Sequence, residues 1–103
     1  MTYDTVSDEL IGAARLRVRM GSSLTFDSEI RELIAAARAD LVREGITTEK
    51  VMDENDPLIR RALMLYVKAE FGLNNPDSEK YKNSYETLKR HLALSCEYTG
   101  GDA

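Results

Sequence analysis

The stretch DPLIRRALMLYVKAEFG, residues 56–72, decides the expected fold. Asp56 can cap a helix by accepting hydrogen bonds from backbone amides, and Pro57 suits the first helical position, where its missing N–H costs nothing. Apolar side chains then recur at spacings of three and four residues and cover more than half of the helix circumference. We therefore expect a central helix that runs to Phe71 and is ended by Gly72.

Downstream of a turn at residues 73–76, a further helix is expected, with Asp77 or Ser78 as its cap. Apolar residues recur on one face of this helix over four turns: Tyr81, Tyr85, Leu88, Leu92 and Cys96. On this face Cys96 is interpreted as a small buried hydrophobic residue. From Tyr98 onward there is no packing signal. We expect a helical domain at residues 1–97 and a flexible tail at residues 98–103.

Upstream, residues 27–44 carry the clearest helical pattern, with Asp27 or Ser28 as possible caps and Gly45 as the end. Its apolar face consists of Ile30, Leu33, Ile34, Ala37 and Leu41, and its charged residues, Arg38 and Asp40 among them, are expected on the solvated faces. The following connection, residues 46–56, has no helical period beyond one short turn that Thr47 or Thr48 could start. Its length favours a functional or mobile loop.

The first helix is expected to begin near Val6, with Thr5 or Ser7 as its cap, and to end near Arg17. Together the four patterns predict an all-α domain. We expect a small bundle of four main helices, with a long connection between the second and the third helix.

Alternating arginines follow the first helix. From residue 15 to residue 20 charged and apolar side chains alternate with the period of a strand, which predicts an extended stretch and then a turn at residues 21–23. In an extended chain Arg15, Arg17 and Arg19 would share one face and could bind phosphates or carboxylates, whereas in a helix they would scatter. A solvated face paired with the protein's own acidic residues is the favoured interpretation.

The composition excludes several function classes. The 103 residues suffice for one domain, and their 14 basic and 18 acidic side chains give a net charge of −4, which argues against a dedicated duplex-DNA binder. With one cysteine and one histidine, His91, the chain lacks the ligands for a zinc site, and we expect no metal and no cofactor. No phosphate-binding loop or hydrolase motif occurs, so the chain is interpreted as a non-enzyme. We expect neither a membrane span nor an export signal.

Several short motifs occur together in a recognisable order. The segment ALMLYVKAEFG at residues 62–72 is followed by NNPD at 74–77, KY at 80–81, SYE at 84–86 and Leu88, and is preceded by IAAAR at 34–38. In this order and spacing, from about Val6 to Leu92, the chain resembles the small phage head-tail connector proteins, which are often described as phage DNA-packaging proteins. The matched residues are apolar positions, so what carries over is core packing: Tyr66, Phe71, Tyr81, Tyr85 and Leu88.

The resemblance implies a non-enzymatic adaptor of a phage or prophage. Copies would assemble as a ring of about twelve beneath the portal protein, extend the DNA channel and provide a platform for a downstream head-completion or tail protein. DNA would pass through without sequence-specific binding, and the net charge suggests an acidic channel wall. The protein would reside at the head-tail junction of the virion, and in the host cytoplasm during assembly. The alternative is a small helical DNA-binding or regulatory protein that uses the three arginines.

Interface residues do not carry over from the resemblance. As candidates for contact with a partner protein we take charged and aromatic residues of the arginine stretch, the long connection and the tail: Arg15, Arg17, Arg19, Lys50, Asp53, Glu54 and Tyr98.

Overall fold

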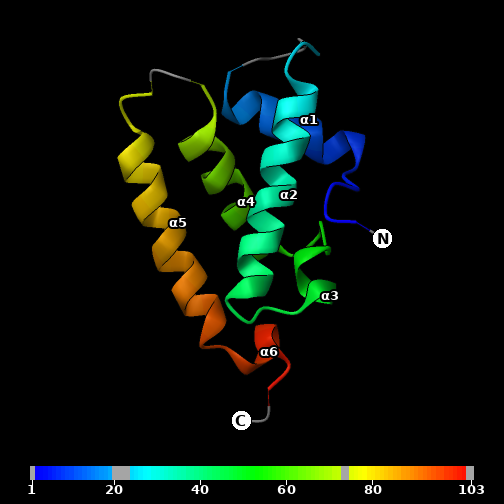
Figure 1. Cartoon of the computed structure of the whole chain (residues 1–103), viewed down its shortest axis with the longest axis vertical. Helices are drawn as coiled ribbons and strands as arrows, with labels where there is room; N and C mark the ends of the chain where they lie inside the picture. Colours follow the sequence, from blue (N-terminus) through cyan, green and yellow to red (C-terminus); the bar gives the residue numbers. More distant parts are fainter. Residues whose placement is uncertain (1, 20–23, 73–74, 102–103) are drawn as a thin grey trace.

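The computed structural model describes residues 2–19, 24–72 and 75–101, and within these ranges the chain forms helices and no strand. Four helices are long, α1 (Asp8–Arg17), α2 (Asp27–Arg43), α4 (Pro57–Glu70) and α5 (Ser78–Ala93), and two are single turns, α3 (Thr48–Val51) and α6 (Cys96–Thr99). In Figure 1, α2, α4 and α5 follow the long axis of the molecule, α1 crosses their upper end, and α3 and α6 lie at the lower end. The expected all-α bundle of four main helices is confirmed.

Helix α4 is the centre of the bundle, as predicted, and packs against α1, α2 and α5. The carboxylate of Asp56 accepts hydrogen bonds from the backbone amides of Leu58 and Ile59 at 2.9 and 3.2 Å, so the expected cap is present. The helix ends at Glu70, one residue before the expected end, and Gly72 follows with a φ of 84°. Its buried side chains are Ile59, Ala62, Leu63, Met64, Val67 and Ala69.

The start of α1 follows from a local residue, and the start of α2 does not. Ser7 caps α1 by accepting a hydrogen bond from the amide of Leu10 at 3.1 Å. The cap predicted for α2 is wrong, because Phe26 occupies that position and the carboxylate of Asp27 accepts a hydrogen bond from Arg15 instead. An ion pair with a neighbouring helix has thus replaced the local capping role of an aspartate.

The end of α2 leads directly into the long connection. Gly45, with a φ of 116°, allows two backbone hydrogen bonds that close the helix, from its own amide to Val42 and from the amide of Ile46 to Leu41. The short turn expected next is α3, and Thr47 caps it by accepting a hydrogen bond from the amide of Lys50 at 3.2 Å.

The connection is packed, which corrects its interpretation as a mobile loop. Ile46 and Val51 are fully buried in the hydrophobic core. Thr47 donates a backbone hydrogen bond to the carbonyl oxygen of Tyr98 at 2.9 Å, so the connection is also tied to α6. Its length serves packing at the lower end of the bundle.

The chain after α5 differs from the expectation at two residues. Because α5 ends at Ala93, the helical register does not continue to Cys96, which starts α6 and is exposed rather than buried. Tyr98 does have a packing role. It belongs to α6, its ring packs in the core, and only 6% of the residue's surface is exposed. Its hydroxyl donates to the carboxylate of Asp56 at 3.0 Å. Packing therefore continues past residue 97.

The extended stretch predicted after α1 is absent up to Arg19. Arg15 and Arg17 belong to the last turn of α1, Val18 is its C-cap, and Arg19 adopts a left-handed conformation with a φ of 63°. The three arginines therefore do not share the face of a strand. The rest of the predicted stretch and the turn, residues 20–23, lie outside the described residues.

Candidate interaction surfaces

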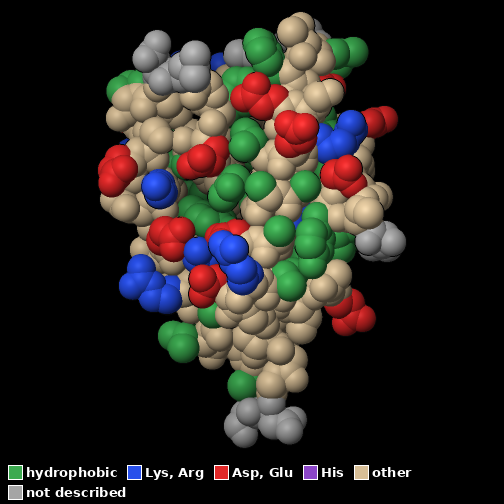
Figure 2. Space-filling view, viewed as in Figure 1, with side chains coloured by type: hydrophobic (Ala, Val, Ile, Leu, Met, Phe, Trp, Pro, Cys, Tyr) green, Lys and Arg blue, Asp and Glu red, His purple; other side chains and the backbone are tan. Residues whose placement is uncertain are grey.

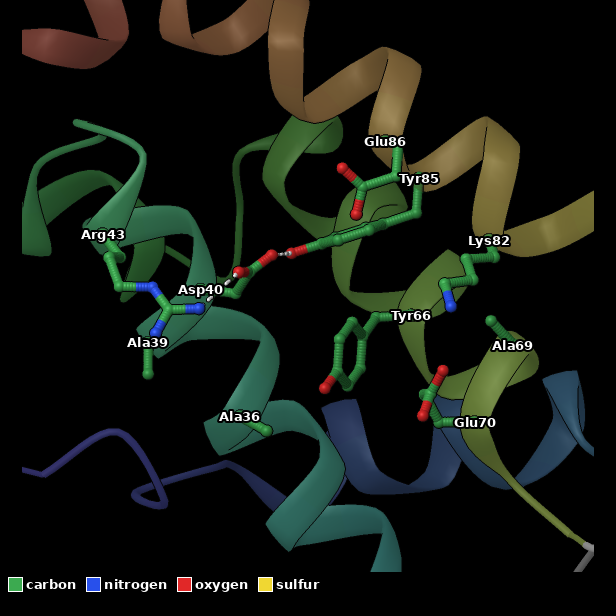
Figure 3. A pocket seen from close by; sticks show the side chains of 10 residues that line it. All are labelled: Ala36, Ala39, Asp40, Arg43, Tyr66, Ala69, Glu70, Lys82, Tyr85 and Glu86. Atoms are coloured by element: carbon green, nitrogen blue, oxygen red, sulfur yellow. Dashed lines mark hydrogen bonds and ion pairs between the residues drawn. The ribbon is translucent and has the colours of Figure 1, made fainter. Parts of the chain in front are cut away.

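The first candidate surface is an open groove of about 470 Å³ where α2, α4 and α5 meet, here called the α2–α5 groove. Alanine and tyrosine side chains form its floor and charged side chains form its rim, as Figure 2 shows for the hollow between α5 and α2. Its lining consists of Ala36, Ala39, Asp40, Arg43, Tyr66, Ala69, Glu70, Lys82, Tyr85 and Glu86 (Figure 3).

One ammonium group organises the polar side of this groove. The Nζ atom of Lys89 lies 2.9 Å from Oδ2 of Asp40, 3.1 Å from Glu86 and 3.7 Å from Glu44. Tyr85 donates its hydroxyl proton to the same Asp40 oxygen at 2.7 Å, and in Figure 3 its side chain points from α5 towards α2. Two helices that are far apart in sequence are thereby joined.

The pKa values of these groups follow from their contacts. Burial alone would raise the pKa of Asp40, but the hydrogen bonds from Tyr85 and Lys89 outweigh it and keep this pKa below its ordinary value. Burial alone would lower the pKa of Lys89, yet the carboxylates of Asp40 and Glu86 raise it. Burial and the Asp40 carboxylate both raise the pKa of the Tyr85 phenol. A protonated, paired ammonium and a protonated phenol stabilise helix packing and are poor nucleophiles at neutral pH.

The second candidate surface is a groove of about 570 Å³ between the end of α1 and the outer side of α4, here called the cationic groove. None of its described lining residues is acidic. Its lining consists of Arg17, Pro57, Leu58, Arg60, Arg61, Met64, Leu65 and Lys68. It adjoins a hollow between α4 and α5 with which it shares Arg61 and Leu65. Among the described lining residues of that hollow, Arg61 is the one arginine and there is no lysine, so the cationic surface covers the end of α1 and the side of α4.

Of the four basic side chains in this groove, two have a partner within the described residues and two have no ion pair there. Arg60 forms an ion pair with Glu9 and donates from Nη1 to its carboxylate at 3.1 Å, and Lys68 lies over the ring of Tyr81 at 4.4 Å. Arg17 and Arg61 are exposed and have no ion pair with any residue of the described ranges. Two guanidinium groups are therefore free to meet carboxylates of another molecule.

The structure separates Arg15 from the other two candidate arginines. The Nε atom of Arg15 lies 2.9 Å from Oδ1 of Asp27, so this arginine joins α1 to α2. Arg17 lines the cationic groove, and it also lines, together with Arg19, a hollow at the start of α5.

Two of the other candidates belong to the short helices at the lower end of the bundle in Figure 1, Lys50 to α3 and Tyr98 to α6. Lys50 pairs with Glu97 at 3.8 Å and lies over the ring of Tyr98, whereas Asp53 is exposed. The carboxylate of Glu54 accepts hydrogen bonds from the amide and the hydroxyl of Ser7, the residue that caps α1. Glu54 therefore connects the segment after α3 to the start of α1.

Arg38 is the most deeply buried charge of the described residues, and its expected place on a solvated face of α2 is wrong. Its side chain is fully buried and donates to the carbonyl oxygens of Tyr3, Thr5 and Val51 at 2.9, 2.8 and 3.1 Å. It also faces Glu54 at 3.6 Å. The spacing held the signal, since Arg38 is eight residues after Ile30 and falls on the apolar stripe.

The described ranges contain neither a candidate metal site nor a candidate membrane span. No group of three or more histidine, cysteine, aspartate and glutamate residues there could hold a metal ion. None of the helices in those ranges has the length and hydropathy needed to span a bilayer.

The comparison with protein families gives one result. Residues 14–99 match a family model described as phage connector protein. The match extends from the second half of α1 to the end of α6 and includes all lining residues of both grooves. Comparisons with curated proteins and with solved structures give no match.

Proposed function

Because the chain belongs to the phage connector protein family, as the sequence resemblance predicted, we propose that it is a non-enzymatic adaptor at the head-tail junction of a tailed phage or prophage. Copies assemble as a ring of about twelve beneath the portal protein and extend the DNA channel. The ring then provides a platform for a downstream head-completion or tail protein. The observation that carries this proposal is a family match that covers nearly the whole helical domain.

The two grooves support an assembly role. They differ in charge, and a ring with head-to-tail contacts brings two different surfaces of one chain together. Asp40 and Tyr85 of the α2–α5 groove are held, together with Lys89, in a hydrogen bond and an ion pair that join α2 to α5. Both features suit a protein whose surfaces dock with other proteins.

We further propose that DNA passes through the channel without sequence-specific binding. The chain carries a net charge of −4, which disfavours strong attraction of phosphates. The alternative, a DNA-binding protein that uses Arg15, Arg17 and Arg19, loses support because Arg15 is paired with Asp27, which leaves Arg17 and Arg19 beside one hollow at the start of α5.

The test combines the purified chain with portal rings from the same phage or prophage. Mass measurement by native mass spectrometry is expected to show a ring of copies bound to each portal. Failure of the chain to join portal rings would contradict the adaptor function. Titration with duplex DNA at increasing salt tests the alternative, because a genuine duplex binder loses affinity steeply with salt whereas the adaptor shows little binding at low salt.

A further inference from the structure

We propose that, within the ring of the proposed function, the cationic groove of one copy docks against the α2–α5 groove of the next copy. The proposal rests on that function and identifies the two surfaces through which neighbouring copies meet. In this proposal, the molecule that binds in the cationic groove is a second copy of this chain.

Charge complementarity is the first argument. Four of the 14 basic residues line the cationic groove, so the remainder of the chain carries ten basic and 18 acidic residues. Arg17 and Arg61 line this groove, and neither has an ion pair with a described residue. A second copy of such an acidic chain is a matching partner for a patch of unpaired cations.

Apolar side chains in the same groove favour a protein over a nucleic acid. Leu58 is 41% exposed and Leu65, on the same side of α4, is half-buried, whereas Met64 lies beneath them in the core. Phosphate groups gain nothing from these side chains, whereas a protein surface with its own apolar floor removes them from water. The groove thus combines an apolar floor with a cationic rim.

The α2–α5 groove has a mixed rim, in which three of the five charged lining residues are acidic, namely Asp40, Glu70 and Glu86, and two are basic, Arg43 and Lys82. Its floor is apolar through Ala36, Ala39 and Tyr66, and Glu70 on its rim is exposed and has no ion pair with a described residue. Glu86 binds Lys89, but its side chain remains 45% exposed. Carboxylates are therefore available at the rim to receive the guanidinium groups of a neighbour.

The positions of the two grooves suit head-to-tail contact. On α4, Arg61, Leu65 and Lys68 line the cationic groove, and Tyr66, Ala69 and Glu70 line the α2–α5 groove. These two sets occupy different faces of one helix because successive side chains of an α-helix are rotated by about 100° around its axis. A symmetric dimer through the cationic groove would place cations against cations, whereas a head-to-tail contact pairs opposite charges and can close a ring.

Charge reversal tests the proposal without breaking any ion pair within the described chain. The variant Arg17→Glu/Arg61→Glu and the variant Glu70→Lys are each expected to weaken ring formation on portal rings at least tenfold. A mixture of the two variants in equal amounts is expected to recover assembly, because each altered surface then meets a complementary one. Lys80→Glu, an exposed reversal that lines neither groove, is the matched control and should assemble like the natural chain.

Each outcome decides between the proposals. If the natural chain joins portal rings and the groove variants join them equally well, this contact is wrong and the adaptor function stands. If variants that keep their helical circular dichroism lose assembly and the mixture does not recover it, head-to-tail pairing of these grooves is also wrong. If Arg17→Glu/Arg61→Glu lowers affinity for short duplex DNA while rings still form, the cationic groove faces DNA. If the natural chain does not join portal rings, the proposed function fails first.

Discussion

The hydroxyl oxygen of Tyr85 lies 2.7 Å from Oδ2 of Asp40, and this hydrogen bond joins α5 to α2. The ring of Tyr85 is buried and meets the ring of Tyr66 edge to face, with centroids 5.2 Å apart. One residue therefore contributes to the apolar core of the bundle and to the polar side of the α2–α5 groove.

Substitutions at Tyr85 should separate these two contributions. We expect Tyr85→Ala to lower the free energy of unfolding by about 3–5 kcal/mol, because it empties a buried aromatic site. Tyr85→Phe keeps the ring and loses a hydrogen bond to a carboxylate, at a cost of about 1.5 kcal/mol. Urea unfolding followed by circular dichroism measures both. Tyr81→Phe, on the same helix and more exposed, is the control and should change stability by less than about 0.5 kcal/mol.

The pH dependence of stability should report on Asp40. Its pKa is lower in the folded protein than in the unfolded chain, so near pH 4 the unfolded chain binds more protons. This contribution is complete above about pH 5 and is lost as the pH falls through the folded-state pKa. Unfolding measured between about pH 3 and 7 should show a shallower decline for Asp40→Asn than for the natural chain. Parallel curves would show that Asp40 does not contribute.

The fold was predictable where its signals are local. The cap at Asp56, the proline after it and the glycines at 45 and 72 act on backbone groups a few residues away, and each ends or begins a helix where expected. Position Ala93 offered no such signal, since neither glycine nor proline follows it. The end of α5 there is followed by the single turn α6, whose Tyr98 packs in the core, a contact that local patterns do not encode.

The candidate surfaces were less predictable because their contacts join distant segments. Glu54 binds Ser7, 47 residues away, and Arg38 donates to a carbonyl 35 residues away, so charge in the sequence did not indicate exposure. The outer stripe of α4 is visible as the spacing of Leu58, Arg61 and Leu65. Its combination with Arg17 of α1 requires the fold.

Two glycines should respond to alanine in opposite directions. Gly45 has a φ of 116°, which strains any residue with a Cβ atom, and Gly45→Ala should cost about 1–2 kcal/mol. Gly12 lies within α1, and a Cβ atom there would meet nothing within 4 Å. Gly12→Ala should therefore stabilise the protein by about 0.5–1 kcal/mol. Thermal unfolding of both variants provides the measurement, and a shift in the same direction for both would contradict the argument.

Tyr98 should matter for stability although only five residues of the sequence follow it. Tyr98→Ala removes a buried ring and its hydrogen bond to Asp56, with an expected loss of about 3 kcal/mol. Leu94→Ala is the control, because Leu94 is 81% exposed and its loss should change stability by less than about 0.5 kcal/mol. Urea unfolding compares them. Equal stability of the two variants would restore the interpretation of residues 98–103 as a tail without packing.

Arg38 provides the strictest test of the packing at the lower end. Arg38→Met keeps much of the volume but leaves the carbonyl oxygens of Tyr3, Thr5 and Val51 without their buried donor, at an expected cost of about 3–5 kcal/mol. Arg38→Lys keeps the charge and should recover only part of this loss, because an ammonium cannot reproduce the planar fork. Arg43→Met, on the same helix with 84% of its side chain exposed, should cost less than about 0.5 kcal/mol. Hydrogen exchange at residues 2–6 and 46–52 should accelerate in Arg38→Met alone, and unchanged exchange there would show that the guanidinium does not hold these segments.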